Sequence, residues 1–250
     1  MVLVKTQGLV LRTTAYSETS VIAKVFTREM GVKSYIFKGV RSSKSRTKQN
    51  LLQPLSHLDM TVYNNPKKQI QFVKELHTAH ADVGSARPNE RQYGNAMRFF
   101  IDELLYKTMR EEEPNPALFD FTVQRLKDME DAGVGTGRAD FPLVYMVNLT
   151  HHLGIRPLNN YSMQEPVFNL KEGRFVAPPS MRAKAQDVNT AYVIEPSMST
   201  LLHYYLEGQT PVTTLAQRKQ LINILLEYFK IHIVDFKTFH SHEILHDVMQ

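Results

Sequence analysis

Cysteine is absent from all 250 residues of this chain. A disulfide framework, a cysteine-ligated zinc site and a thiol nucleophile are therefore excluded. No segment approaches the roughly 18 consecutive apolar residues that a transmembrane helix requires. The apolar run at the N-terminus is also too short for a signal peptide. Together these absences predict a cytoplasmic protein without a membrane partner.

The sequence also lacks the loop motifs of several common enzyme classes. It contains no Walker-type phosphate loop, no G-x-G-x-x-G and no G-x-S-x-G, so nucleotide hydrolysis and α/β-hydrolase chemistry have no support. The acidic run at residues 111–113 precedes Pro114, which is typical of a solvated helix end rather than of paired catalytic carboxylates. We therefore predict a non-enzymatic protein with no catalytic residues and no cofactor.

The charge of the chain is distributed unevenly. Residues 1–80 hold 13 Lys or Arg against 4 Asp or Glu, whereas residues 81–250 hold 17 against 21. The whole positive excess therefore lies in the first third of the sequence. Such an asymmetry is typical of a polyanion-binding module joined to a second domain.

The period of the hydrophobic pattern in residues 1–80 is that of β-strands. Apolar residues alternate with polar ones around Met60, and Ile70 and Phe72 alternate with glutamines in the same way. Turn residues at 64–67 separate these two segments, and Gly31 can supply the positive φ of an earlier tight turn. About five short strands in 80 residues predict a small OB-type barrel, with an SH3-like barrel as the alternative.

From about residue 88 the period becomes helical. The segment 155–190 contains four prolines, so we expect it to be an irregular, cysteine-free insertion with a small hairpin at 166–176. The predicted fold is therefore α+β, with an OB-type domain at 1–80 and a helical domain at 81–250. The expected helices are 88–105, 115–131, 140–153, 197–207 and 215–236.

The most basic segment is residues 38–48, which carry five cations and no acid, with small polar residues between the charges. Lys and Arg neutralise phosphates by releasing counterions, and hydroxyl groups add hydrogen bonds. A solvated, flexible connection is the alternative, but we favour a nucleic-acid-binding loop. The predicted binding residues are Lys38, Arg41, Lys44, Arg46 and Lys48, with Lys24, Lys67 and Lys68 extending the patch.

Aromatic residues near these cations are candidates for base stacking. They are Tyr16, Tyr35 and Phe37, although each is also consistent with the core of a barrel. OB-type grooves bind RNA as well as DNA, so an RNA-binding protein associated with tRNA or the ribosome is an alternative function.

A cluster of histidines near the C-terminus favours a different class of function. His242 and His246 have the spacing of zinc ligands on a helix, with Glu243 between them, and His240 lies close by. A metalloenzyme is therefore a second alternative. The cluster lies near the end of the sequence and no third ligand follows it, so we expect a solvated tail and no metal site.

Several short segments, taken in order, resemble the RecO family of bacterial recombination mediators. The resemblance rests on weak motifs whose order is specific. They are GLVLRT at 8–13, YSET at 16–19, FTREMG at 26–31, KGVRS at 38–42, QP at 53–54, EEEPNPALF at 111–119 and HLGIRP at 152–157.

This resemblance implies an OB fold followed by a helical domain, with no catalytic turnover. It further implies binding to single- and double-stranded DNA and annealing of complementary strands. The implied partners are RecR, the acidic C-terminal tail of single-stranded DNA-binding protein and, indirectly, RecA, with a location at the nucleoid. Many members of the family carry a four-cysteine zinc module that this sequence lacks, so residues 159–179 would form a metal-free version.

An acidic peptide with an apolar end requires an apolar pocket with cations at its rim. The helical region is net acidic, so few of its cations can serve in such a site. The predicted partner-binding residues are Arg125, Lys127, Arg138 and Arg156, beside Phe121, Leu126 and Tyr145.

Overall fold

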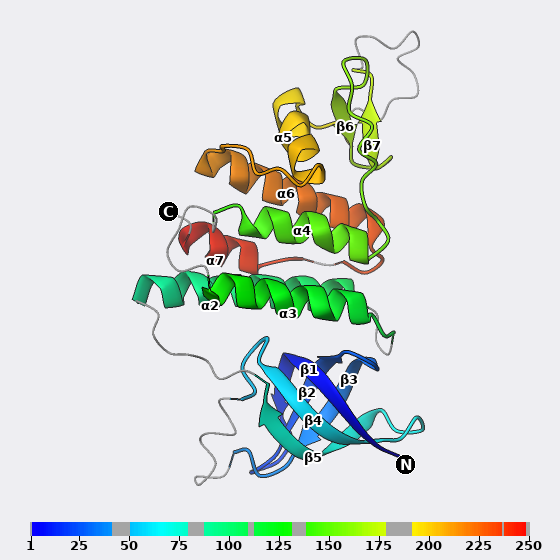
Figure 1. Ribbon diagram of the computed structural model, residues 1–250, viewed down its shortest axis with the longest axis vertical. Coiled ribbons are helices and arrows are strands. Elements are labelled where there is room, and N and C mark those ends of the chain that lie inside the picture. Colours follow the sequence, from blue (N-terminus) through cyan, green and yellow to red (C-terminus); the bar gives the residue numbers. More distant parts are fainter. Residues whose placement is uncertain are drawn as a thin grey trace. The chain divides into compact units, whose positions relative to one another are not determined.

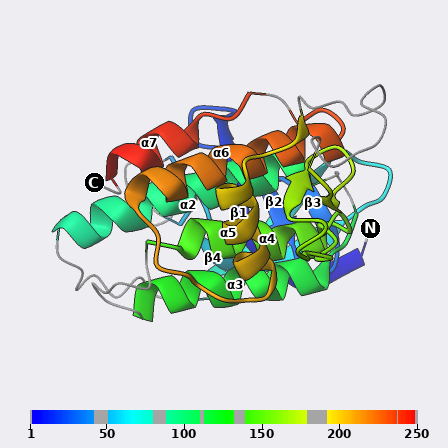
Figure 2. The ribbon, with the colours of Figure 1, turned by 90° about the horizontal axis from the view of Figure 1, so that it is seen from above.

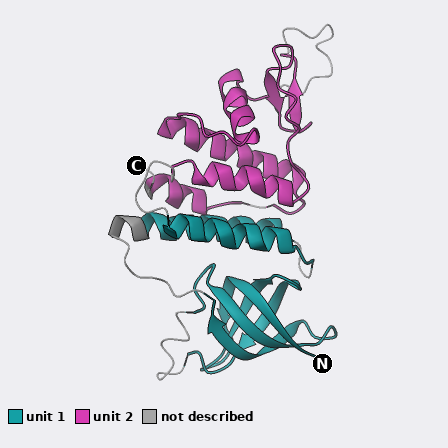
Figure 3. Cartoon of the chain, in the orientation of Figure 1, with its two compact units in different colours: residues 1–133 teal, residues 134–250 magenta. Residues whose placement is uncertain are grey.

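The computed structural model describes residues 2–41, 51–79, 88–109, 113–131, 139–178, 192–236 and 238–248. The chain divides into two compact units, Met1–Gly133 (unit 1) and Val134–Gln250 (unit 2), as Figure 3 shows. The change from strands to helices falls between Thr78 and Pro88, within unit 1, near the domain boundary at residue 80 that the sequence predicts. Among the described residues, no helix combines the length and the apolar character needed to cross a membrane.

Five strands of unit 1 pair in a closed ring in the order β1-β2-β3-β5-β4 (Figure 1). All neighbouring strands are antiparallel except β3 and β5, which are parallel. This closed five-stranded topology is that of an OB-type barrel, so the predicted α+β fold is confirmed. The strands are β1 (Val2–Ala15), β2 (Val21–Thr27), β3 (Gly31–Phe37), β4 (His57–Asn64) and β5 (Ile70–Thr78).

The interior of the barrel is filled by alternate residues of these strands. Leu58, Met60 and Val62 point inward as their alternation predicts, and each is at most 3% exposed. Gly31 has φ +66° in the turn between β2 and β3, as expected from the sequence. A Cβ atom there would lie 2.6 Å from the backbone oxygen of Glu113, so the turn requires glycine for a second reason.

The inward face of β5 differs from the prediction. Gln71 is buried at 2% exposure, whereas Ile70 and Phe72 are each 36% exposed. The reason is a bulge. Thr61 pairs with Glu75 and the next residue, Val62, pairs with Val73, so that Lys74 is an extra residue on β5. An extra residue reverses the alternation along a strand, so Ile70 and Phe72 face outward.

The described part of unit 1 also contains two helices, α2 (Pro88–Thr108) and α3 (Pro116–Asp131). Helix α3 begins at a proline, as predicted, and Asn115 caps it because the Leu118 amide donates to Asn115 Oδ1 at 2.9 Å. The ring of Phe119 packs edge-on against Phe26 of the barrel, with centroids 5.4 Å apart.

Unit 2 is mainly helical. In Figures 1 and 2, α4 and α6 run side by side and α5 crosses them, and all three are in contact. Helix α6 begins with a capping box formed by Thr214 and Gln217, and it ends at His232, four residues before the predicted end. The elements are α4 (Phe141–His152), β6 (Val167–Asn169), β7 (Arg174–Val176), α5 (Pro196–Leu206), α6 (Leu215–His232) and α7 (Ser241–Val248).

The predicted hairpin in the irregular segment is confirmed as β6 and β7. It is fixed by the side-chain amide of Asn160, which accepts from the Phe175 amide and donates to the Phe175 carbonyl, each at 2.9 Å. Phe168 and Phe175 are completely buried beneath it. Hydrogen bonds and packing therefore hold this segment, and its remaining residues from 179 to 190 lie outside the described part of the chain.

Candidate nucleic-acid interface

An exposed aromatic ring on the barrel lies between two lysines. Lys38 Nζ is 5.1 Å from the centroid of the Phe72 ring, and Lys68 Nζ is 5.8 Å from it. Lys38 directly follows β3, Lys68 belongs to the turn between β4 and β5, and Phe72 lies on β5. The three residues form the Phe72 cluster, which combines a π-face with two cations at the surface.

Gln71 explains why the turn before β5 has a fixed shape. Its side-chain Oε1 accepts from the Asn65 amide at 2.8 Å, and its Nε2 donates to the carbonyls of Asn65 and Lys68, at 3.0 and 2.5 Å. Asn65 Oδ1 also accepts from the Lys67 amide at 3.0 Å. A buried amide therefore holds the backbone that carries Lys67 and Lys68, while the next side chain along the strand, Phe72, faces solvent.

A second cluster repeats this arrangement. Arg12 Cζ lies 4.9 Å from the centroid of the Tyr106 ring, and Lys24 Nζ lies 5.5 Å from it. Tyr106 is on α2 and is 38% exposed. Arg12 and Lys24 are paired neighbours on β1 and β2. We name these three residues the Tyr106 cluster.

The strand register shows that the strand residues of both clusters point to the outside of the barrel. Arg12 pairs with Lys24, Lys24 with Ser34, and Ser34 with Ile70. Residues paired across strands point to the same face of a sheet. The next row on this face ends at Phe72, which pairs with Ile36. Because the ring closes in the order β1-β2-β3-β5-β4, the Tyr106 cluster beside β1 and β2 and the Phe72 cluster beside β3 and β5 lie on different sides of the barrel.

Arg41 has a structural role at the end of the barrel. Its Nη1 donates to the Ser17 carbonyl at 2.9 Å, and its amide donates to the Thr19 carbonyl at 3.1 Å. These bonds fix the loop between β1 and β2, which carries Tyr16. Arg41 therefore positions this loop, whatever it contributes to phosphate binding.

The three aromatic candidates from the sequence have different environments. Tyr16 is 61% exposed, whereas Tyr35 and Phe37 are at most 2% exposed inside the barrel. Only Tyr16 among them is accessible to a base. Sequence alternation assigned Phe72 to the core, so its role was missed, although the lysines predicted at 38 and 68 lie over its ring. Lys44, Arg46 and Lys48 lie outside the described residues.

The four predicted partner-binding cations do not share one environment. Arg125 pairs with Asp128 at 2.8 Å, and Arg156 donates to the Leu206 carbonyl at 2.9 Å. Arg125 and Lys127 belong to unit 1, whereas Arg156 belongs to unit 2. Arg138 lies outside the described residues. Tyr145 was predicted to line an accessible site, but this side chain is completely buried.

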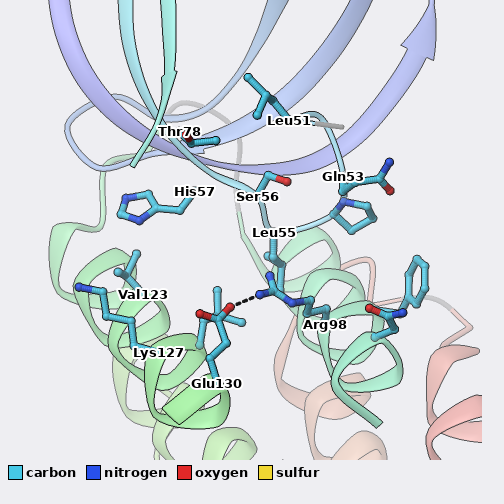
Figure 4. Close-up of a pocket in the computed structure, with 14 residues that line it drawn as sticks. Leu51, Gln53, Leu55, Ser56, His57, Thr78, Arg98, Val123, Lys127 and Glu130 are labelled. Carbon is cyan, nitrogen blue, oxygen red and sulfur yellow. Dashed lines mark hydrogen bonds and ion pairs between the residues drawn. The ribbon is translucent and has the colours of Figure 1, made fainter. Parts of the chain in front are cut away.

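Lys127 and Leu126 line a cavity of about 490 Å³ in unit 1 (Figure 4). Its walls are the segment before β4, with Leu51 and Leu55, and the facing sides of α2 and α3. Arg98 of α2 and Glu130 of α3 form an ion pair at its border. The cavity thus combines an apolar lining with cations at the rim.

The C-terminal histidines lie on a packed helix. Leu245 of α7 is completely buried and Phe239 just before it is 4% exposed, so the expectation of a solvated tail is wrong. The rings of His242 and His246 are 5.5 Å apart, and burial together with the neighbouring His242 lowers the pKa of His246. In the part of the chain that the structure describes, no three His, Asp or Glu side chains are grouped to hold a metal.

Comparison with known proteins identifies the same family at both ends of the chain. The profile described as "Recombination protein O N terminal" matches residues 1–81, and "Recombination protein O C terminal" matches residues 95–237. Curated relatives named "DNA repair protein RecO" align over nearly their full length. Those from Azobacteroides pseudotrichonymphae and Christiangramia forsetii are 25% and 27% identical, covering 98% of this chain and 99% of each relative. The one from Flavobacterium johnsoniae is 26% identical and covers 98% of both.

Proposed function

The chain belongs to the RecO family of DNA repair proteins, and from this premise we propose that it is a DNA-binding recombination mediator without catalytic turnover. It binds single- and double-stranded DNA and anneals complementary strands. With RecR, it helps RecA load onto single strands that are coated by single-stranded DNA-binding protein. This activity places it in the cytoplasm, at the nucleoid.

The observation that carries the proposal is the presence of two clusters on the outer surface of the barrel. In each cluster two cations lie over an aromatic ring: Lys38 and Lys68 over Phe72, and Arg12 and Lys24 over Tyr106. Proteins that bind single strands combine a cationic groove along the backbone with rings that stack on bases. Among the described residues, no carboxylate forms an ion pair with Lys38 or Lys68, so both are available to phosphates.

A salt titration with a fluorescent single-stranded oligonucleotide tests this proposal. Each phosphate contact contributes about 0.7 to the slope of log affinity against log salt for a single strand. The double substitution K38A/K68A should therefore reduce the slope by about 1.4. An unchanged slope in a variant with a native circular dichroism spectrum would exclude the Phe72 cluster as the DNA site.

Annealing is measured with two complementary labelled strands. The protein should accelerate the loss of donor fluorescence as the strands pair, and K38A/K68A should slow this reaction in proportion to its lost DNA binding. A protein that binds both strands tightly without accelerating pairing would lack the annealing activity.

We place the site for an acidic, apolar-ended tail peptide of single-stranded DNA-binding protein at the cavity in unit 1. Lys127 provides a cation at its rim, beside the ion pair of Arg98 with Glu130, and Leu51, Leu55 and Leu126 provide apolar surface. Lys127→Glu should weaken binding of a tail peptide about tenfold, the effect of one lost contact of about 1.4 kcal/mol. Lys171→Glu makes the same charge change at a residue that does not line the cavity, and it should leave peptide affinity unchanged.

A further inference from the structure

We propose that the Phe72 cluster is a sensor of unpaired bases. Phe72 stacks one base of a single strand, and Lys38 and Lys68 turn from the ring to the flanking phosphates. The barrel thereby prefers single-stranded nucleic acid, and its affinity for the strand falls when the strand pairs. This inference rests on the proposed DNA binding and names the form of nucleic acid that the site selects.

The first argument is the inversion at the start of β5. An apolar ring faces solvent at 36% exposure, while the neighbouring Gln71 occupies the buried side at 2%. A core strand normally has the opposite arrangement. The buried amide fixes the turn that carries Lys68, and the bulge turns Phe72 outward. Together, the buried amide and the bulge hold one exposed ring beside one cation.

The second argument is that the arrangement occurs twice on the outer surface of the barrel. Tyr106 is exposed to nearly the same degree as Phe72, and it also lies beneath two cations. A single exposed aromatic residue is ordinary on a protein surface. Two such rings, each with two cations, are two separate places on the barrel surface at which a base can stack beside a cation.

The third argument concerns what a ligand displaces. A lysine over an exposed ring is held by a weak cation–π contact, whereas a base stacked on a ring gains more. A bound base therefore replaces the lysines on Phe72, and the freed lysines gain phosphate contacts that release counterions. In the absence of nucleic acid the two lysines cover the apolar ring, which keeps it from other apolar surfaces.

Duplex DNA engages the cluster differently. Its bases are stacked on one another and paired, so their faces are unavailable to Phe72. Only the phosphates remain, and these contact Lys38 and Lys68 in a single strand and in a duplex alike. Phe72 therefore contributes to affinity only before pairing, and an annealed product leaves the face more easily than its separate strands.

The test measures affinity for three ligands of equal length: an oligothymidylate, an abasic deoxyribose-phosphate strand, and a duplex. Phe72→Ala should weaken oligothymidylate binding between about fivefold and about 150-fold, the range for one stacked base. It should leave the abasic strand, the duplex and the salt slope unchanged. K38A/K68A should weaken all three ligands and reduce the salt slope.

Conservative variants separate stacking from a structural role of the ring. Phe72→Tyr keeps a stacking face and should retain oligothymidylate affinity, whereas Phe72→Leu keeps an apolar side chain and should lose it. Tyr204→Ala removes an exposed ring of unit 2, which is 37% exposed, and should have no effect on any of the three ligands. If Phe72→Ala fails to fold, the comparison of Tyr with Leu gives the answer.

The outcomes distinguish this inference from the proposed function. If Phe72→Leu binds oligothymidylate as well as the unmodified protein while K38A/K68A weakens it, base sensing is wrong and DNA binding at this face stands. Equal weakening of all three ligands by Phe72→Leu also overturns base sensing. If neither variant affects any ligand, both the inference and the proposed DNA site are wrong.

Discussion

The barrel and unit 2 use their cations in different ways. Residues 1–80 hold 13 Lys or Arg with 4 Asp or Glu, whereas residues 134–250 hold ten of each kind. In unit 2, Arg156 donates to the Leu206 carbonyl and Arg218 donates to the Thr213 carbonyl at 2.7 Å. On the barrel, Lys38 and Lys68 lie over an exposed ring. Cations that have acceptors in their own chain maintain the fold, and cations without them are available to a ligand.

The helices of unit 1 form a third case. Residues 81–133 hold 7 Lys or Arg against 11 Asp or Glu, so the acidic excess of the chain lies there. One of these acids, Asp102 of α2, is only 2% exposed. Burial raises the pKa of Asp102 to about 8, with a further increase from Glu103 and an opposing effect of Arg12. This part of the molecule therefore buries a carboxyl group that keeps its proton at neutral pH, whereas the barrel presents its charges outward.

Substitution of Asp102 should produce the largest effect and tests whether the helices set the pH response of stability. The folded pKa of about 8 lies above the value of roughly 3.9 for an unfolded chain. The folded state therefore keeps a proton that the unfolded state releases, and stability falls as the pH rises from about 4 to about 8. Asp102→Asn stays neutral and should remove this loss, which is on the order of several kcal/mol.

Denaturant unfolding at about pH 5 and about pH 8.5 measures most of the difference, because most of the window lies between them. The unmodified protein should be less stable at the higher pH, and Asp102→Asn should be nearly equal at both. A variant that keeps the full pH dependence would show that another group causes it. Asp120→Asn is the control for an exposed carboxylate and should leave this window unchanged.

The second prediction concerns the remaining cations of the basic segment. Replacing Lys44, Arg46 and Lys48 with Ala should reduce the salt slope for a single strand by about 2, or about a hundredfold in affinity at roughly 0.1 M salt. The matched control removes three lysines of unit 2, Lys171, Lys219 and Lys230, and should leave DNA binding unchanged. Equal losses from the two triple variants would remove the distinction between the barrel and unit 2.

The comparison also shows what sequence could predict. The counts of charged residues located the cationic module, because residues 1–80 contain few acidic residues that could neutralise its cations. Turn residues such as Gly31 indicated where the strands begin and end. The Phe72 cluster was not predictable from local patterns. Its members Lys38 and Phe72 are 34 positions apart and meet through the parallel pairing of β3 with β5, which local periodicity does not specify.

At two places the prediction from the local sequence was wrong. The bulge at Lys74 reversed the faces of β5, so the alternation of Ile70 and Phe72 indicated a core that lies on the other side. At the C-terminus, the proximity to the chain end indicated a solvated tail, although Leu245 is completely buried. The bulge depends on how β5 pairs with β4, and the burial of Leu245 depends on packing of the folded chain, and local periodicity specifies neither.

The third prediction tests the turn that displays the cations of the Phe72 cluster. Gln71→Leu removes three hydrogen bonds to the backbone of the turn and leaves their partners partly unsatisfied, at a cost of about 2 kcal/mol. The turn should loosen, and single-strand affinity should fall about tenfold, the equivalent of 1.4 kcal/mol. Gln69→Leu changes a neighbouring exposed glutamine and serves as the control. If Gln71→Leu lowers stability without changing affinity, the turn does not need a fixed shape for binding.

The smallest effect concerns Arg28, a barrel cation that breaks the pattern of its neighbours. Its Nε and Nη2 donate to the two carboxylate oxygens of Asp120 on α3, each at 2.8 Å. These bonds lower the pKa of Asp120 below its usual value. The pair therefore stabilises the fold above the unfolded pKa of Asp and loses its effect as the pH falls through the lower folded pKa. Both side chains are exposed, so the contribution to stability is small and decreases with salt.

Because Arg28 already has an acceptor in its own chain, it should behave like the arginines of unit 2. Arg28→Ala should lower the unfolding midpoint slightly, mainly at low salt, and should leave the salt slope of DNA binding unchanged. Lys68→Ala should do the reverse, with a slope reduced by about 0.7 and an unchanged unfolding midpoint. A reduced slope for Arg28→Ala would mean that DNA competes with Asp120 for this side chain. The division between structural and ligand-binding cations would then follow from the strength of each ion pair rather than from its presence.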